Sequence, residues 1–155
     1  MKPSFSQGLR SRLMLPMGLL IVLTGCRQPE PTTRSTIIRI KAAGGWQDTG
    51  VVVAAASPFS LRVVSGQIHD SETKILDGAG SDYVCGRPDC CEPMPNVRRS
   101  AVIGRLGSQV FDVSNGGFFE DHRGGALFLR VNDCDEGLYD NGGTLTVAFA
   151  PGDAH

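Results

Sequence analysis

Several features that would point to a common functional class are missing from this sequence of 155 residues. The only adjacent pair of arginines is Arg98-Arg99, so no basic run is available for a nucleic acid. No apolar run reaches the roughly 20 residues that a membrane-spanning helix requires. No serine stands in a Gly-x-Ser-x-Gly elbow, and the neighbours His69-Asp70 and Asp121-His122 are typical of solvated loops. These absences favour a binding protein over an enzyme or a nucleic-acid-binding protein.

Helical periodicity is also absent, and short runs of alternating apolar residues, separated by Gly, Pro, Asn and Asp, take its place. The pattern predicts an all-β domain over residues 36–151, a small β-sandwich or jelly roll of roughly eight strands. The clearest expected strands are Ser35–Lys41, Thr49–Ala54, Phe59–Val64, Ala101–Leu106, Gln109–Ser114, Gly125–Val131 and Thr144–Ala150.

Two details of this pattern concern individual side chains. Leu127, Leu129 and Val131 alternate with Phe128 and Arg130, which predicts that Arg130 lies on the outer face of its strand. Phe118 and Phe119 lie between two glycine pairs, and we expect both rings to plug a hairpin or crossover loop.

The first 25 residues have the composition of a secretory signal. Lys2, Arg10 and Arg12 precede an apolar run of about a dozen residues. The run ends in Leu23-Thr24-Gly25-Cys26, which resembles a bacterial lipobox, so we expect Cys26 to be acylated and to anchor the protein in a membrane. An ordinary signal with a coincidental cysteine is the alternative.

Residues 26–35 are polar, contain Pro29 and Pro31, and are expected to form a flexible tether behind the anchor. Without the leader, the chain has 12 basic and 16 acidic residues and a net charge of −4. These features predict an exported, lipid-anchored protein of a bacterial cell envelope. Arg27-Gln28 lack the Asp that resembles an inner-membrane retention signal, which favours the outer membrane.

Four cysteines remain in the body of the chain: Cys85, Cys90, Cys91 and Cys134. An exported domain with four cysteines is expected to form two disulfides. Because Cys90 and Cys91 are adjacent, two schemes stay open: Cys85–Cys90 with Cys91–Cys134, and Cys85–Cys91 with Cys90–Cys134. A zinc site is the rival, although the sequence has no Cys-x-x-Cys spacing and no nearby histidine.

The segment Asn132–Gly143 is the richest in oxygen ligands. It holds four carboxylates and two Asn amides between two apolar runs, with glycines that allow a tight backbone. Hard cations such as calcium require such a set of ligands from one loop. The alternative is an acidic, solvated hairpin turn without a metal.

The order of these segments resembles the LecA-type (PA-IL-like) bacterial lectins, which are calcium-dependent and galactophilic. The similarity covers residues 46–150 and is carried by Ser65-Gly66, Asp77-Gly78, the paired cysteines, Ala101–Gly107, Gly125–Val131, Asn132-Asp133, Asp140–Gly143 and Thr144–Phe149. The resemblance implies a galactose-binding-like sandwich that binds a carbohydrate through Ca²⁺.

The resemblance also implies roles for individual residues. The metal ligands would be the carboxylates of Asp133 and Asp140, the amide of Asn141 and the carbonyl of Gly137, with the carbonyl of Leu138 as its nearest competitor. A further ligand would come from residues 67–70, where no single residue can be chosen. The ligand-binding set around the metal is Asp133, Cys134, Asp140 and Asn141, together with Tyr83 and Tyr139. The two tyrosines are candidate sugar platforms because both lie in these loops, and the alternative for Tyr139 is a wedge in the metal turn. Asp135 and Glu136 would form a solvated rim, and Trp46 is interpreted as a core residue.

The chain departs from the family in two places. The loop before the paired cysteines reads Asp77–Tyr83 and contains no histidine where the family has its sugar-contacting His-Pro. Cys134 follows the expected metal ligand, so a disulfide there would clamp the long loop 67–99 to the metal loop.

From the sequence as a whole we expect a calcium-dependent lectin-like lipoprotein. The alternative is a structural or protein-interaction module whose calcium only stabilises the loop, and the oligomeric state stays open.

Overall fold

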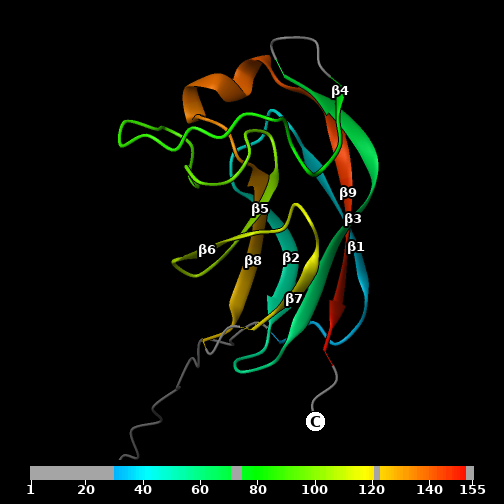
Figure 1. Ribbon diagram of the computed structural model, residues 1–155. Coiled ribbons are helices and arrows are strands. Elements are labelled where there is room, and N and C mark those ends of the chain that lie inside the picture. The colour runs from blue at the N-terminus through cyan, green and yellow to red at the C-terminus, as the bar shows by residue number, and fades with distance from the viewer. Residues whose placement is uncertain (1–29, 71–74, 121–122, 153–155) are drawn as a thin grey trace, which may run out of the picture.

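The computed structural model describes residues 30–70, 75–120 and 123–152, so the expected signal and Cys26 lie outside the described residues. Within these ranges the chain forms two antiparallel sheets packed face to face, as the sequence predicts (Figure 1). The five-stranded sheet is formed by β1 (Thr36–Lys41), β9 (Gly142–Pro151), β3 (Phe59–His69), β4 (Ile75–Leu76) and β7 (Gly117–Phe119). The four-stranded sheet has the order β2 (Gln47–Val53), β8 (Gly125–Val131), β5 (Val102–Leu106) and β6 (Gln109–Asp112).

The core lies between the sheets and contains the apolar positions that the alternation selected. Leu127, Leu129 and Val131 of β8 are fully buried, and Leu145, Val147 and Phe149 of β9 face them at no more than 1% exposure. Burial of such side chains stabilises the fold by about 1.5–3 kcal/mol each. The two central strands therefore bring their carboxyl and amino ends, which flank Asn132–Asn141, to one end of the sandwich.

Two expectations about local structure were wrong. Strand β3 does not stop at Val64 but continues to His69, because a bulge between Val63 and Ser65 lets the chain stay paired with β9. Phe119 does plug the space beside Phe59 and Phe111, whereas Phe118 is 84% exposed. Arg130 does lie on the outer face of β8, as the alternation predicts, but its side chain is only 2% exposed there.

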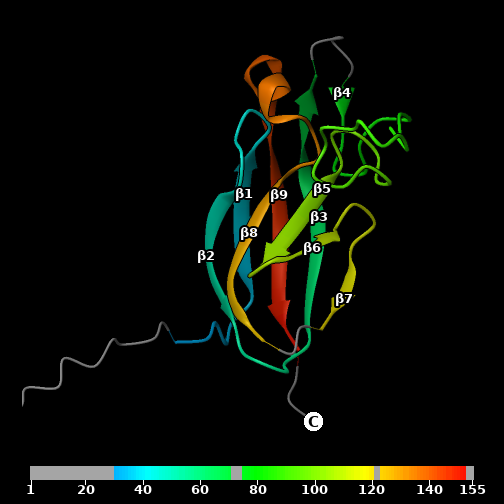
Figure 2. The ribbon, with the colours of Figure 1, turned by 90° about the vertical axis from the view of Figure 1, so that its left-hand side faces the viewer.

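The two ends of the sandwich differ in character (Figures 1 and 2). The 3₁₀ helix η1 (Asp135–Asp140), strand β4 and the irregular segment 77–101 lie together at one end. The last described residues of the chain lie at the opposite end of the sandwich, and so do residues 30–35. There, the Thr32 N–H donates to the Val52 carbonyl at 2.6 Å. The described end of the expected tether is therefore attached to β2 rather than free. No helix in the described ranges is long and apolar enough to span a membrane.

Candidate ligand-binding cleft

An open cleft of about 660 Å³ lies at the end of the sandwich that carries η1. Its walls come from three separate segments: Asp70 after β3, Ser81–Tyr83 and Arg99 from the long irregular segment, and residues between β8 and β9. The lining residues are Asp70, Ser81, Asp82, Tyr83, Arg99, Asp133, Cys134, Gly137, Asp140 and Asn141. Four carboxylates and one guanidinium make the cleft acidic.

Asn132, which is fully buried, holds the loop that leads to Arg99. Its side-chain amide donates to the carbonyls of Met94 at 2.9 Å and Val97 at 3.0 Å, and its Oδ1 accepts from Met94 N–H at 3.0 Å. One buried side chain thereby provides hydrogen-bond partners for backbone groups of a loop that has no regular secondary structure. Asn132 positions the Arg99 wall relative to Asp133.

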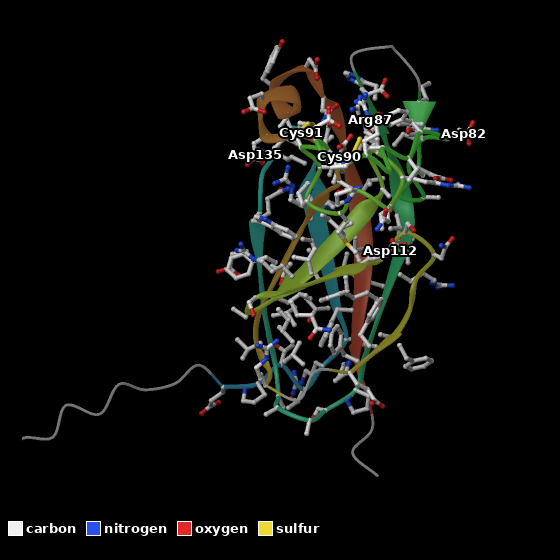
Figure 3. The ribbon with its side chains drawn as sticks, turned by 60° about the vertical axis from the view of Figure 1, so that its left-hand side comes forward. Asp82, Arg87, Cys90, Cys91, Asp112 and Asp135 are labelled. Atoms are coloured by element: carbon white, nitrogen blue, oxygen red, sulfur yellow. A yellow bond between two sulfur atoms is a disulfide. The ribbon has the colours of Figure 1, made fainter. Side chains whose placement is uncertain are left out.

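Two disulfides hold the same loop (Figure 3). Cys85 bonds Cys90, and Cys91 bonds Cys134, which is the first of the two schemes that the sequence left open. The second bridge joins segments 43 residues apart and attaches the long loop to the residue that follows Asp133. The clamp that the sequence suggested is therefore present, and Cys134 reaches the cleft as half of a disulfide.

A glycine allows the long loop to pass beneath Arg99. Gly80 has a φ of +81°, and a Cβ there would lie 2.6 Å from both Ala101 N and the Arg99 carbonyl oxygen. Ser81 N–H donates to that same carbonyl at 2.8 Å. Only glycine adopts this conformation without strain and admits so close an approach.

Asp133 lines the cleft and is 6% exposed. Its Oδ1 accepts from Cys134 N–H at 2.8 Å, and its Oδ2 accepts from the side-chain amide of Asn141 at 2.9 Å. Gly137 is beside it, since an added Cβ would lie 3.5 Å from both carboxylate oxygens. Asn141 is 7% exposed, and its Oδ1 is buried without a hydrogen-bond partner. The pairing with Asp133 fixes the amide orientation, because a carboxylate only accepts.

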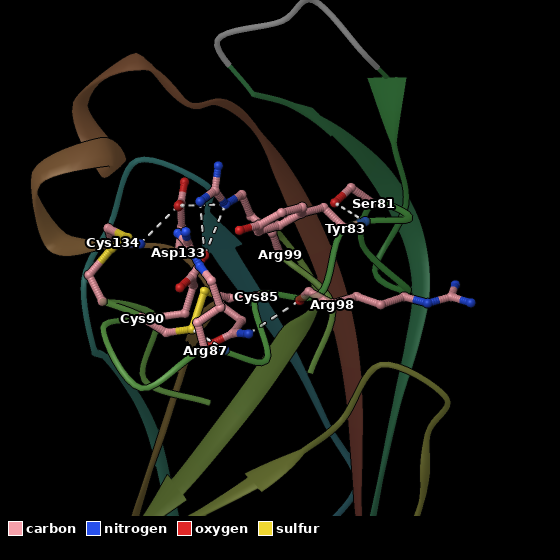
Figure 4. Close-up of polar contacts among 12 residues, drawn as sticks. Ser81, Tyr83, Cys85, Arg87, Cys90, Arg98, Arg99, Asp133 and Cys134 are labelled. Carbon is pink, nitrogen blue, oxygen red and sulfur yellow. Dashed lines mark hydrogen bonds and ion pairs between the residues drawn. A yellow bond between two sulfur atoms is a disulfide. The ribbon is translucent and has the colours of Figure 1, made fainter. Parts of the chain in front are cut away.

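Arg99 forms the opposite wall (Figure 4). Its guanidinium donates to Glu92 Oε1 from NH2 at 2.9 Å and from Nε at 3.2 Å, and Nε lies 3.6 Å from Asp133 Oδ1. The guanidinium also lies over the Tyr83 ring, 4.8 Å from its centroid. Burial alone would lower the pKa of Arg99, but the Glu92 hydrogen bond and the charges of Asp133, Glu92 and Tyr83 together raise it. Arg99 therefore carries a permanent positive charge.

Arg130 supports the loop from below. It donates to the carbonyl oxygens of Val131 at 3.0 Å and Asp133 at 2.7 Å, and to Asp135 Oδ1 at 2.7 Å. Its guanidinium carbon lies 5.6 Å from the Trp46 ring centroid. Trp46 is thus half-buried on the outer face of β8, rather than in the core between the sheets. Asp135 is exposed, as expected of a rim, and in addition it pairs with a buried cation.

The structure brings together most of the residues that the sequence selected. Asp133, Gly137, Asp140, Asn141, Cys134 and Tyr83 all line the cleft, and Asp70 is the residue of the 67–70 segment that joins them. Tyr139 does not join them: it is 84% exposed and is not part of the lining. On a six-residue 3₁₀ helix, its neighbours Leu138 and Asp140 face other directions.

The oxygens in the cleft fit a hard cation such as calcium. Carboxylates, an amide oxygen and a carbonyl are its preferred ligands. The Asn141 Oδ1, which has no hydrogen-bond partner, is an oxygen that a cation would coordinate. The carboxylates are not drawn tightly together. Among the described residues, the groups of three His, Cys, Asp or Glu ligand atoms within 4.8 Å of one another are two disulfide pairs, each with Glu92. A cation held by three of these carboxylates would therefore require Asp70 or Asp140 to move toward Asp133.

No protein-family model matches the sequence. No curated protein matches it significantly either. A solved structure described as the EclA N-terminal domain, a PllA-like lectin, superposes with a TM-score of 0.56 and 18% sequence identity. The match covers 76% of this chain and 95% of that chain. The resemblance to lectins drawn from the sequence therefore holds at the level of the fold: this chain has the β-sandwich fold of a PllA-like lectin domain.

Proposed function

We propose that the protein is a calcium-dependent carbohydrate-binding lipoprotein and that its cleft takes the hydroxyl groups of a sugar, with a galactoside as the first candidate. The observation that carries the proposal is the convergence of Asp70, Asp133, Gly137, Asp140 and Asn141 on one cleft. Four of these residues belong to the segment 133–141, and Asp70 comes from a segment far away in the sequence. The solved PllA-like lectin with the same fold supports a carbohydrate as the ligand class.

The chain's own residues would supply the binding without catalysis. Asp133, Asp140, Asn141 Oδ1 and the Gly137 carbonyl would hold the calcium ion, with Asp70 as the additional carboxylate. When bound, calcium would provide open coordination positions for vicinal hydroxyls. The exposed Tyr83 ring, held beneath Arg99, offers an apolar face beside the cleft for the C–H side of a sugar ring.

The alternative function is a structural or protein-interaction module whose cation only rigidifies the loop. The Cys91–Cys134 bridge favours it, because the covalent clamp already limits how far the cleft can open. The two functions differ in one respect that can be measured, which is whether a soluble ligand binds in a calcium-dependent manner.

A glycan array probed with the full-length protein in detergent tests the proposal. We expect galactoside-containing spots to bind the protein in the presence of calcium, and chelation to remove that binding. An array without any calcium-dependent spot, combined with intact calcium binding in solution, would support the structural module instead.

The two tyrosines provide a matched pair for the same array. Tyr83→Ala is expected to weaken glycan binding by about 5- to 30-fold, a loss of about 1–2 kcal/mol, because it removes the aromatic face at the cleft. Tyr139→Ala removes an exposed ring outside the lining and should leave binding unchanged. Equal effects of the two changes would contradict the placement of the sugar beside Tyr83.

The lipid anchor is part of the same proposal and rests on the sequence around Cys26. We expect the protein to fractionate with membranes and to incorporate an alkyne-tagged fatty acid. Cys26→Ser should abolish the label and release the exported domain, since one acylated residue would carry the anchor. Unchanged labelling of the serine variant would contradict lipidation at this residue.

A further inference from the structure

A calcium ion that enters the cleft would have to bind beside a positive charge that is already there, the guanidinium of Arg99. The guanidinium lies 3.6 Å from Asp133 Oδ1, and Asp133 is the central expected metal ligand. A calcium ion on the same carboxylate would lie within a few ångströms of that positive charge. Since Arg99 is half-buried, solvent would screen the repulsion only in part.

Arg99 has a second partner that allows it to leave Asp133. Glu92 Oε1 accepts two hydrogen bonds from the guanidinium, and the carboxylate of Glu92 is 2% exposed. The Arg99 side chain itself is 40% exposed and forms no hydrogen bond to Asp133. The guanidinium can therefore shift toward solvent and keep its Glu92 pair.

We propose that Arg99 is the resting counter-cation of the cleft and that calcium binds in competition with it. The inference rests on the proposed function and adds its regulation. Without the divalent ion, Arg99 compensates the Asp133 carboxylate and keeps the acidic cleft stable. When the ion binds, Asp133 changes partners, and Arg99 stays on Glu92 and the Tyr83 ring. The arrangement lowers calcium affinity and limits binding to environments rich in the ion.

The test is calcium calorimetry on the full-length protein in detergent. Arg99→Gln alone leaves the buried Glu92 carboxylate without its partner and risks misfolding. The principal variant is therefore Glu92→Gln with Arg99→Gln, which removes the cation and keeps the net charge of the protein. We expect it to bind calcium at least about tenfold more tightly than the wild type, because repulsion of this kind is worth more than about 1.4 kcal/mol at a partly buried site.

Arg98→Gln is the matched control for the loss of the positive charge of Arg99. It is the adjacent residue with the same charge, it is exposed, and its side chain extends away from Asp133 (Figure 4). We expect Arg98→Gln to change the affinity by less than about twofold, as for a screened surface charge.

Each outcome of the titration separates the two proposals. Tighter binding by the double variant supports the competition, and so does binding by that variant when the wild type binds no calcium. Equal or weaker binding by the variant overturns the competition and leaves the calcium-dependent function intact. No binding by any of the proteins overturns both the competition and the calcium part of the proposed function.

Discussion

Replacing Asn132 by alanine is expected to destabilise the protein by about 2–4 kcal/mol, because buried backbone groups then lose their partners. The N–H and carbonyl of Met94 and the carbonyl of Val97 all bond to this side chain. Alanine cannot replace any of these bonds. The loop is not part of a sheet, so no neighbouring strand supplies other hydrogen-bond partners for these groups. Urea unfolding with the disulfides intact measures the loss.

The control for this prediction is Asn96→Ala, an exposed asparagine in the same loop. Its effect should stay within about 0.5 kcal/mol, the usual range for surface changes. Limited proteolysis gives a second reading, because the loss of Asn132 should open residues 84–98 to cleavage while the sheets stay protected. Similar stability of both variants would show that the disulfides, and not Asn132, hold the loop.

The sequence predicted the strands well where one face of a strand packs on the core. Strand β8 has the expected bounds, and its Leu127, Leu129 and Val131 are fully buried. The same alternation gave the correct face for Arg130 but not its burial, because burial on the outer face of β8 depends on Trp46 and Asp135, which other segments supply. Periodicity reports the direction of a side chain but not what another loop places over it.

The candidate site was predictable in part for a similar reason. Asp133, Asp140 and Asn141 belong to one continuous segment, and the resemblance to the lectin family selected them. Arg99, Glu92 and Asn132 act through a loop that is distant in sequence, and Arg99 was read only as part of a basic pair. The disulfide between Cys91 and Cys134 was the available signal, because that pairing places residues 92–99 beside residues 132–133.

The structure gives Asp133 a more central role than the acidic character of its segment suggests. Glu136 belongs to the same segment but is exposed and lies outside the cleft lining. Asp133 is buried, lies beside Gly137, and orients Asn141 so that one amide oxygen is left without a partner. A cation that binds here therefore depends on Asp133 for a ligand and for the orientation of a second ligand.

Asp133→Asn is accordingly expected to abolish calcium binding, with a loss of affinity greater than about 100-fold, or about 2.7 kcal/mol. The new amide keeps the size of the side chain but removes the charge, and its nitrogen opposes either a cation or the donors Cys134 N–H and Asn141 Nδ2. Glu136→Gln removes the same charge from the same loop and should keep the wild-type affinity. Calcium calorimetry on both variants measures the difference. Equal weakening would mean that the net acidity of the segment attracts the ion, whereas selective loss in Asp133→Asn would locate the ion at the carboxylate that faces Asn141.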